Sequence, residues 1–121
     1  MARDIVLYSR ATRCSDIDHV RARLQEWNLP FREIDIEADA AAAARLAVWT
    51  GFLSVPTVVI ADAGGDEPYQ EPAGLTPNMN PRNVDRGSII TEPSTANLRL
   101  FLEHNGFVKV DLYRLGSFLR G

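Results

Sequence analysis

Strand-like and helix-like segments alternate along the first half of the chain, and this order limits the fold more than any other feature of the sequence. Runs of β-branched, aromatic and alternating apolar residues predict strands at residues 4–8, 31–36 and 56–60. An apolar stripe with helical spacing predicts a helix that starts after Cys14. Its members are Ile17, Val20, Leu24 and Trp27. Five consecutive alanines predict a second helix over residues 37–50. Strands that alternate with helices in this way indicate an α/β fold.

The second half of the chain contains a long connection and an apolar tail. Residues 62–86 are rich in Gly and Pro and predict a loop inserted between the third strand and a fourth strand at residues 87–91. A final helix is expected to begin after Ser94, which has the side chain of an N-cap, and to end at residues 105–106. Residues 107–121 form a C-terminal extension rich in apolar side chains, so we expect it to dock on another surface.

Composition and charge exclude several classes of protein. The chain has 121 residues, the size of one compact domain, so we expect a single domain over residues 1–121. Its 45% hydrophobic and 24% charged residues are average for a globular protein and argue against disorder. With 13 basic and 16 acidic side chains and no basic block, no nucleic-acid partner is expected. The sequence has neither a signal-peptide pattern nor a long apolar run, so it predicts a cytoplasmic protein without membrane contact.

Cys14 is the only cysteine, so the chain has no intrachain disulfide and no four-thiolate metal site. At the start of a helix, its sulfur would face unpaired backbone N–H groups and the positive end of the helix dipole. Arg10 and Arg13 lie close in sequence and favour the thiolate, whereas Asp16 and Asp18 oppose it. We therefore expect a nucleophilic thiol that ionises moderately more readily than an ordinary cysteine. The alternative is a small buried hydrophobic side chain. No spacing of His, Cys and acidic residues indicates a metal site.

Four short motifs follow one another along the chain. They are Tyr8-Ser9-Arg10, Arg13-Cys14-Ser15-Asp16-Ile17, Thr50-Gly51 followed by Ser54-Val55-Pro56-Thr57, and Gly87 with Ser94 to Leu98. On these motifs, the chain resembles the thioredoxin fold, and within it the glutaredoxin family, over residues 5–106. The resemblance implies a four-stranded mixed sheet flanked by three helices. The loop at residues 62–86 would be an insertion between the third and fourth strands of that fold.

The resemblance also implies roles for residues around Cys14. Pro56 would be a cis-proline that faces the sulfur, and the backbone of Val55 would pair with the extended chain of a substrate. The side chains expected to bind an anionic substrate or its second polar end are Arg10, Arg13, Ser94, Thr95 and Asn97. In this fold, the third strand runs away from the active site. The inserted loop and the apolar tail are therefore expected to meet at the opposite pole.

Departures from the family pattern limit the chemistry. Ile17 replaces the second cysteine of the Cys-x-x-Cys motif, so only monothiol chemistry is available to this chain. The sequence also lacks the Cys-Gly-Phe-Ser motif of cluster-binding monothiol glutaredoxins, so we expect no cofactor. The alternative is an iron–sulfur cluster shared by a dimer, with an outside thiol to complete its four ligands. A low-molecular-weight thiol such as glutathione would be a co-substrate. Phe52-Leu53 and Ala96-Asn97 stand where the family has polar or acidic side chains that bind glutathione, so the identity of the thiol stays open.

These observations leave three functional hypotheses. The leading one is a glutaredoxin-like monothiol oxidoreductase that acts on mixed disulfides of proteins with a low-molecular-weight thiol, with Cys14 as nucleophile. The second is a non-catalytic thioredoxin-fold module that binds a protein partner or a second copy through its loop and C-terminal tail. The third is a reductase of the arsenate-reductase type, which also has one cysteine after a first strand. The Val55-Pro56 motif argues against this last hypothesis.

Overall fold

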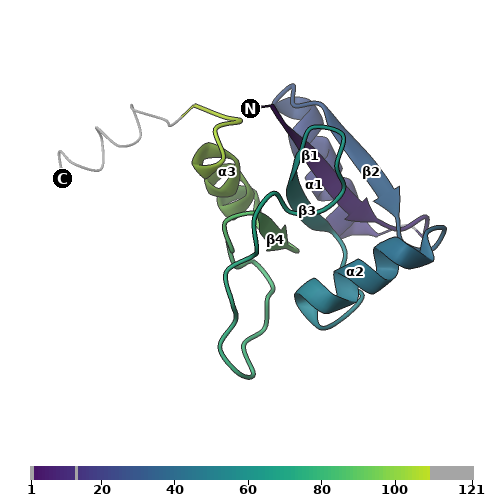
Figure 1. Ribbon diagram of the computed structural model, residues 1–121. Coiled ribbons are helices and arrows are strands. Elements are labelled where there is room, and N and C mark those ends of the chain that lie inside the picture. The colour runs from purple at the N-terminus through teal and green to yellow at the C-terminus, as the bar shows by residue number, and fades with distance from the viewer. Residues whose placement is uncertain (1, 13, 110–121) are drawn as a thin grey trace.

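The structure, a computed structural model, describes residues 2–12 and 14–109 (Figure 1). In this part of the chain, a four-stranded sheet is flanked by three helices. The elements in chain order are β1 (Arg3–Ser9), α1 (Ser15–Glu26), β2 (Phe31–Asp35), α2 (Ala40–Thr50), β3 (Thr57–Asp62), β4 (Ile89–Thr91) and α3 (Thr95–His104). The predicted α/β, thioredoxin-like architecture is confirmed. Among the described residues, no helix is both long enough and apolar enough to cross a bilayer.

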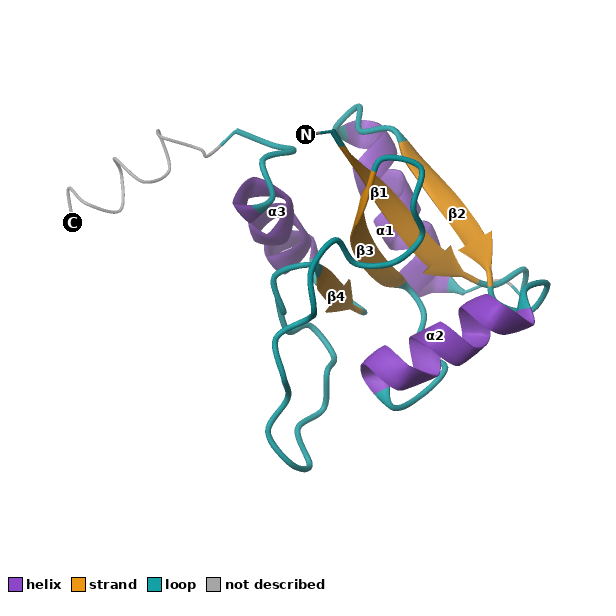
Figure 2. Cartoon of the chain, in the orientation of Figure 1, coloured by secondary structure: helices purple, strands orange, loops and turns teal. Residues whose placement is uncertain are grey.

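The sheet has the strand order β2-β1-β3-β4 and is mixed. β1 is parallel to β2, whereas β3 is antiparallel to both β1 and β4. Successive residues of β1 point to opposite faces, so that Leu7 packs with α1 and α3 while Val6 packs with α2. Helices therefore cover both faces of the sheet (Figure 2). This arrangement explains why the central strands are apolar along almost their whole length.

The ends of the elements follow local hydrogen bonds. α2 begins at Ala40, three residues later than the alanine run and its acidic lead-in suggest, because the Asp39 carboxylate accepts a hydrogen bond from the Ala42 N–H. It ends at Thr50, and the next residue, Gly51, caps it with a left-handed φ of 82° that suits glycine. β4 is shorter than expected and begins at Ile89. Its predicted first residue, Gly87, instead has a left-handed φ of 86°.

The inserted loop begins against the sheet rather than in solvent. The Asp4 carboxylate accepts a hydrogen bond from the Gly64 N–H at 2.9 Å and also pairs with Arg32. The buried Tyr8 hydroxyl donates to the Asp66 carbonyl, and the Tyr69 N–H donates to the Ile60 carbonyl at 2.9 Å. The first part of the insertion therefore lies against β1 and β3.

Arg86, near the end of the insertion, is buried. Its guanidinium donates to the carbonyls of Ala73 at 2.8 Å and of Trp49 at 2.6 Å. The first contact closes the base of the loop, and the second joins it to the last turn of α2. Burial lowers the pKa of Arg86 from its usual value. The side chain nevertheless remains a cation, since an arginine pKa lies so far above neutrality.

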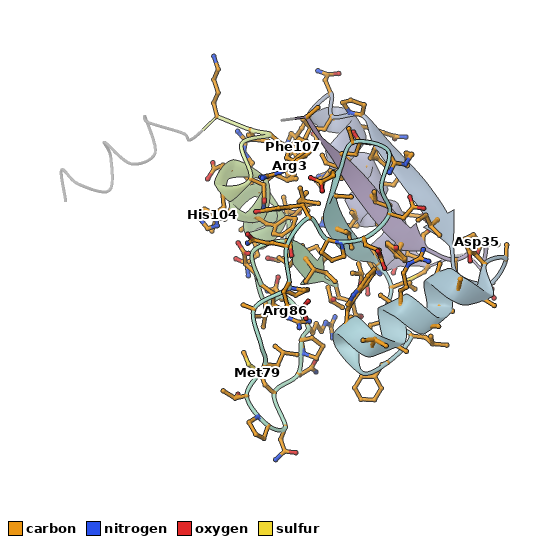
Figure 3. All side chains as sticks on the ribbon, viewed as in Figure 1. Arg3, Asp35, Met79, Arg86, His104 and Phe107 are labelled. Atoms are coloured by element: carbon orange, nitrogen blue, oxygen red, sulfur yellow. The ribbon has the colours of Figure 1, made fainter. Side chains whose placement is uncertain are left out.

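The first residues of the tail lie at the same end of the molecule as the start of the insertion. Phe107 and Val108 pack against the core between the sheet, α1 and α3, and so does Tyr69 of the insertion. Figure 3 shows Phe107 near Arg3, and both line one small pocket. The Arg3 guanidinium in turn lies 3.6 Å from the centre of the Tyr69 ring. The rest of the expected docking segment lies outside the described residues.

Candidate active site

Cys14 occupies the predicted position at the start of a helix. It is the N-cap residue of α1, with extended backbone angles, and its carbonyl accepts the first helical hydrogen bond from the Asp18 N–H at 3.0 Å. The side chain is partly buried and packs against the cluster that contains Tyr8, Ile17 and Val55. One side of the Cys14 side chain therefore packs against the core, and the other side is partly exposed to solvent.

The open side of Cys14 faces a small pocket of about 320 Å³ that Arg10, Asp18 and Arg21 also line. Arg21 is committed to carboxylates, because it donates to Asp18 at 2.9 Å and to Glu33 at 2.5 Å and 2.9 Å. These contacts hold the pKa of Arg21 above its usual value and, with Arg21 as the largest cause, the pKa of Glu33 below its usual value. Arg10 is exposed and forms no ion pair within residues 2–12 and 14–109, although its charge contributes to the lowered pKa of Glu37. It is therefore the arginine at this pocket that is open to an anionic ligand.

The loop between β1 and Cys14 is held by an acidic residue that sequence analysis did not select. The Thr12 N–H and hydroxyl donate to one oxygen of the Glu37 carboxylate at 2.9 Å and 3.0 Å. The backbone N–H of Thr12 is the largest cause that lowers the pKa of Glu37. A Glu just after a strand gives no sign of such a contact in the sequence, because its partner lies 25 residues earlier. Arg13, the next residue of this loop, lies outside the described residues.

The proline expected opposite the sulfur has the expected peptide geometry. The Val55–Pro56 bond is cis, as the resemblance implied. Val55 is buried in the cluster against which Cys14 packs, and the Pro56 carbonyl accepts a hydrogen bond from the Glu92 N–H at 2.7 Å. Tyr8 pairs with Thr57 across β1 and β3, so the end of β1 that leads to Cys14 lies beside the start of β3. The fold thus brings Cys14 and the Val55–Pro56 segment to the same end of the two central strands.

The first part of the chain matches a known family. Residues 5–63 match the family model for glutaredoxin. This segment belongs to the glutaredoxin family. It contains β1, α1, β2, α2 and β3, and with them Cys14 and the cis-proline. No curated protein and no solved structure shows significant similarity to the chain. The match supports a redox function for this thioredoxin fold in general terms.

The polar residues expected to bind the far end of a substrate lie at the start of α3, outside the glutaredoxin segment. Each of these residues, Ser94, Thr95 and Asn97, forms a hydrogen bond with another residue of the protein. The Ser94 hydroxyl accepts from the Asn97 N–H at 3.1 Å, as expected of an N-cap, and the Asn97 amide donates to the Asn83 carbonyl at 3.3 Å. Thr95 lies 2.7 Å from the His19 ring nitrogen, which joins α3 to α1. Their role in substrate binding stays a prediction.

His19 is the second residue that sequence analysis did not place at the site. The spacing of α1 predicts only that it lies off the buried stripe, and its side chain is indeed exposed. Its hydrogen bond to Thr95 depends on how α1 and α3 pack, which no local pattern specifies. His104 lies at the other end of α3 and contacts Asp85 at 2.9 Å. In residues 2–12 and 14–109, no group of three His, Cys, Asp or Glu side chains is arranged to hold a metal ion.

Proposed function

We propose that this protein is a cytoplasmic monothiol thiol-disulfide oxidoreductase that acts on mixed disulfides between a protein and a low-molecular-weight thiol such as glutathione. The observation that carries the proposal is the position of its only thiol: Cys14 is partly exposed at the N-terminus of α1, in a glutaredoxin segment. A thiol at that position faces backbone N–H groups that favour the nucleophilic thiolate. Ile17, at the place of the family's second cysteine, is only 2% exposed and supports the monothiol character.

The proposed reaction consists of two exchanges. The Cys14 thiolate attacks the low-molecular-weight half of the mixed disulfide, the old S–S bond breaks, and the protein thiolate leaves and takes up a proton. Cys14 is then joined to the small thiol by a new disulfide. A second molecule of the small thiol, as its thiolate, attacks the small-thiol sulfur of that adduct and releases the Cys14 thiolate. One protein cysteine is reduced and one free small thiol is oxidised, and the two small-thiol halves leave as their disulfide, so the electrons balance without a cofactor.

The residues around Cys14 have distinct proposed tasks. Arg10, and Arg13 on the same loop, would stabilise the thiolate and attract an anionic thiol, because a guanidinium binds carboxylates in a fixed geometry. Val55 and Pro56 would align the extended chain of the substrate beside the sulfur. The start of α3, at Ser94, Thr95 and Asn97, would contact the remote polar end. No metal takes part in this scheme.

Intact-mass measurements after incubation with glutathione disulfide test the proposal directly. We expect one glutathione adduct on Cys14 and its removal by excess glutathione. Cys14→Ser should lose all transfer activity, and because serine is a good N-cap residue the variant should remain folded. A Cys14→Ser variant that transfers thiols as well as the wild type would refute the proposal.

A second candidate, a non-catalytic binding module, is favoured by one specific observation. Phe52 and Leu53, just before the Val55–Pro56 segment, are 69% and 58% exposed. Large apolar side chains at such exposure are typical of protein contact sites. This candidate predicts a Cys14 thiol that forms no adduct with glutathione disulfide at neutral pH. The same mass measurement therefore separates the two functions.

A further inference from the structure

A pocket of about 220 Å³ lies at the end of the sheet where β1 begins. It is formed by the first residues of β1, the start of β2 and the first residue of the tail. Cys14 follows the opposite end of β1, which ends at Ser9. The residues that line this pocket are therefore different from those assigned to the thiol exchange.

Four apolar side chains line the pocket. Ile5 is buried and pairs with Phe31 in the register of β1 and β2, so both side chains lie on the face of the sheet that α1 and α3 cover. Pro30 precedes Phe31, and Phe107 lines the pocket from the tail. The Phe107 N–H donates to the Leu102 carbonyl at 2.9 Å, which holds this residue beside the last turn of α3. An apolar group in the pocket would thus leave water for side chains that are already in place.

Arg3 brings an unpaired positive charge to the pocket. Its guanidinium lies 3.6 Å from the centre of the Tyr69 ring. This contact holds the guanidinium in place and leaves its N–H groups free, because they point outward in the plane of the group. Within residues 2–12 and 14–109, Arg3 is exposed and forms no ion pair. Arg3 also lies near Phe107 (Figure 3), so a charged and an apolar contact are available to one ligand.

The other charged groups around the pocket limit which ligands fit. Asp4 and Arg32 form an ion pair with each other, and the Asp4 carboxylate also accepts a hydrogen bond from the Gly64 N–H. Because side chains alternate along a strand, Asp4 lies on the face opposite that of Arg3. Asp62 pairs with Arg3 in the register of β1 and β3 and lies on the same face. Its negative charge disfavours a ligand with several carboxylates, whereas a single carboxylate matches the one free guanidinium.

We propose that this pocket binds a small monocarboxylic acid with an apolar body. The carboxylate accepts paired hydrogen bonds from the Arg3 guanidinium, and the apolar body packs beside Phe31 and Phe107. Sites for drug-sized ligands have volumes of about 300 to 1,000 Å³, so this smaller pocket selects a smaller ligand. The inference goes beyond the proposed function and does not depend on it, because no lining residue takes part in the thiol exchange.

A titration with phenylacetate, followed through the backbone amide shifts of the isotope-labelled protein, tests the pocket. We expect saturable binding with the largest shifts at Ile5, Phe31 and Phe107. Phenylacetamide, which has the same ring without the charge, should bind at least about tenfold more weakly. Acetate, which lacks the apolar body, should show a similar loss. These comparisons use the unaltered protein. Equal binding of phenylacetate and phenylacetamide would overturn the proposal, and so would shifts confined to other residues.

Substitution of Arg3 tests the origin of the charge preference. Arg3→Gln should weaken the binding of phenylacetate about tenfold and leave that of phenylacetamide unchanged. Arg3→Lys keeps the charge but not the planar pair of donors, so it should restore only part of the loss. Arg82→Gln is the matched control and should leave the affinity unchanged, because it removes another exposed arginine without an ion pair in the part of the chain that the structure describes. An Arg3→Gln variant with the affinity of the wild type would contradict the assignment.

Discussion

The glutaredoxin segment and the insertion that follows it are stabilised in different ways. Residues 5–63 depend on apolar side chains, since β1 and β3 present fully buried residues to both faces of the sheet. The connection over residues 64–88, which contains most of the insertion, depends on polar side chains that bond to backbone groups. Arg86 donates to two carbonyls, the Ser88 hydroxyl donates to the Gln70 carbonyl, and the Asn105 amide donates to the Gly87 carbonyl.

This difference determines how each region responds to sequence change. An apolar core tolerates substitution as long as volume and pattern are kept. A hydrogen bond between one side chain and one carbonyl requires a particular residue type at a particular place. The first region therefore depends on the pattern and volume of its side chains, whereas the second depends on particular residue types at particular positions.

The largest effect is expected from the apolar core of the glutaredoxin segment. Leu7 is fully buried between the sheet and the helices α1 and α3. Leu7→Ala should lower the free energy of unfolding by about 3 kcal/mol, because it removes buried methyl groups and leaves a cavity. Urea denaturation measures this loss. Leu100→Ala, at a leucine that is 38% exposed on α3, is the control and should cost less than about 1 kcal/mol. Comparable losses in the two variants would contradict an apolar origin of stability in this region.

The corresponding polar test is Arg86→Met, which keeps much of the side-chain length but removes its donors. It leaves the carbonyls of Ala73 and Trp49 without their partner, so we expect a loss of about 2 kcal/mol. Arg86→Lys should recover little, because a single ammonium group does not reproduce the planar pair of donors. Thermal unfolding followed by circular dichroism measures both variants. If Arg86→Met is as stable as the wild type, the insertion does not depend on its polar contacts.

The sequence predicts the first region far better than the second, for a physical reason. The spacing of Ile17, Val20 and Leu24, at intervals of three and four residues, and the β-branched runs of β1 and β3 indicate which face of each element is buried. α2 follows from its alanine run and α3 from its N-cap residue, Ser94. The position of Cys14 follows directly from the start of α1. The cis geometry at Pro56 was expected only through the family resemblance.

The remaining site residues act through contacts between segments that are far apart in the sequence. Thr12 and Glu37 are 25 residues apart, His19 and Thr95 are 76 apart, and Asn83 reaches Ser94 across β4. The spacing of apolar residues cannot predict such pairs, because each hydrogen bond depends on the position of one polar atom and not on which face of a helix or strand is buried. For the same reason, the Gly- and Pro-rich composition of the insertion predicts a loop but gives no indication that Arg86 is buried.

Asn83 allows the position of the insertion against α3 to be tested. Its φ of 63° is left-handed, and its side chain accepts a hydrogen bond from the Ser94 N–H. Asn83→Gly removes only the hydrogen bond, whereas Asn83→Ala also places an alanine in the left-handed region. We expect the alanine variant to be about 1 kcal/mol less stable than the glycine variant in urea denaturation. Equal stabilities would show that this turn is not constrained in the folded protein.

The smallest expected effect is electrostatic and lies in the glutaredoxin segment. Arg21 holds the pKa of Glu33 below its usual value of about 4.5, so the folded state favours the charged carboxylate. This contribution is complete above about pH 4.5 and is lost as the pH falls through the lowered folded-state value. Since the pair is partly exposed and screened by salt, it should be worth less than about 1 kcal/mol.

Glu33→Gln should therefore be slightly less stable than the wild type at pH 7 and should lose less stability on acidification. Denaturation curves from pH 7 to pH 3 measure both slopes. Glu67→Gln, at an exposed carboxylate with no ion pair among the described residues, is the matched control and should leave the slope unchanged. A Glu33→Gln slope equal to that of the wild type would mean that Arg21 stabilises the site by geometry alone.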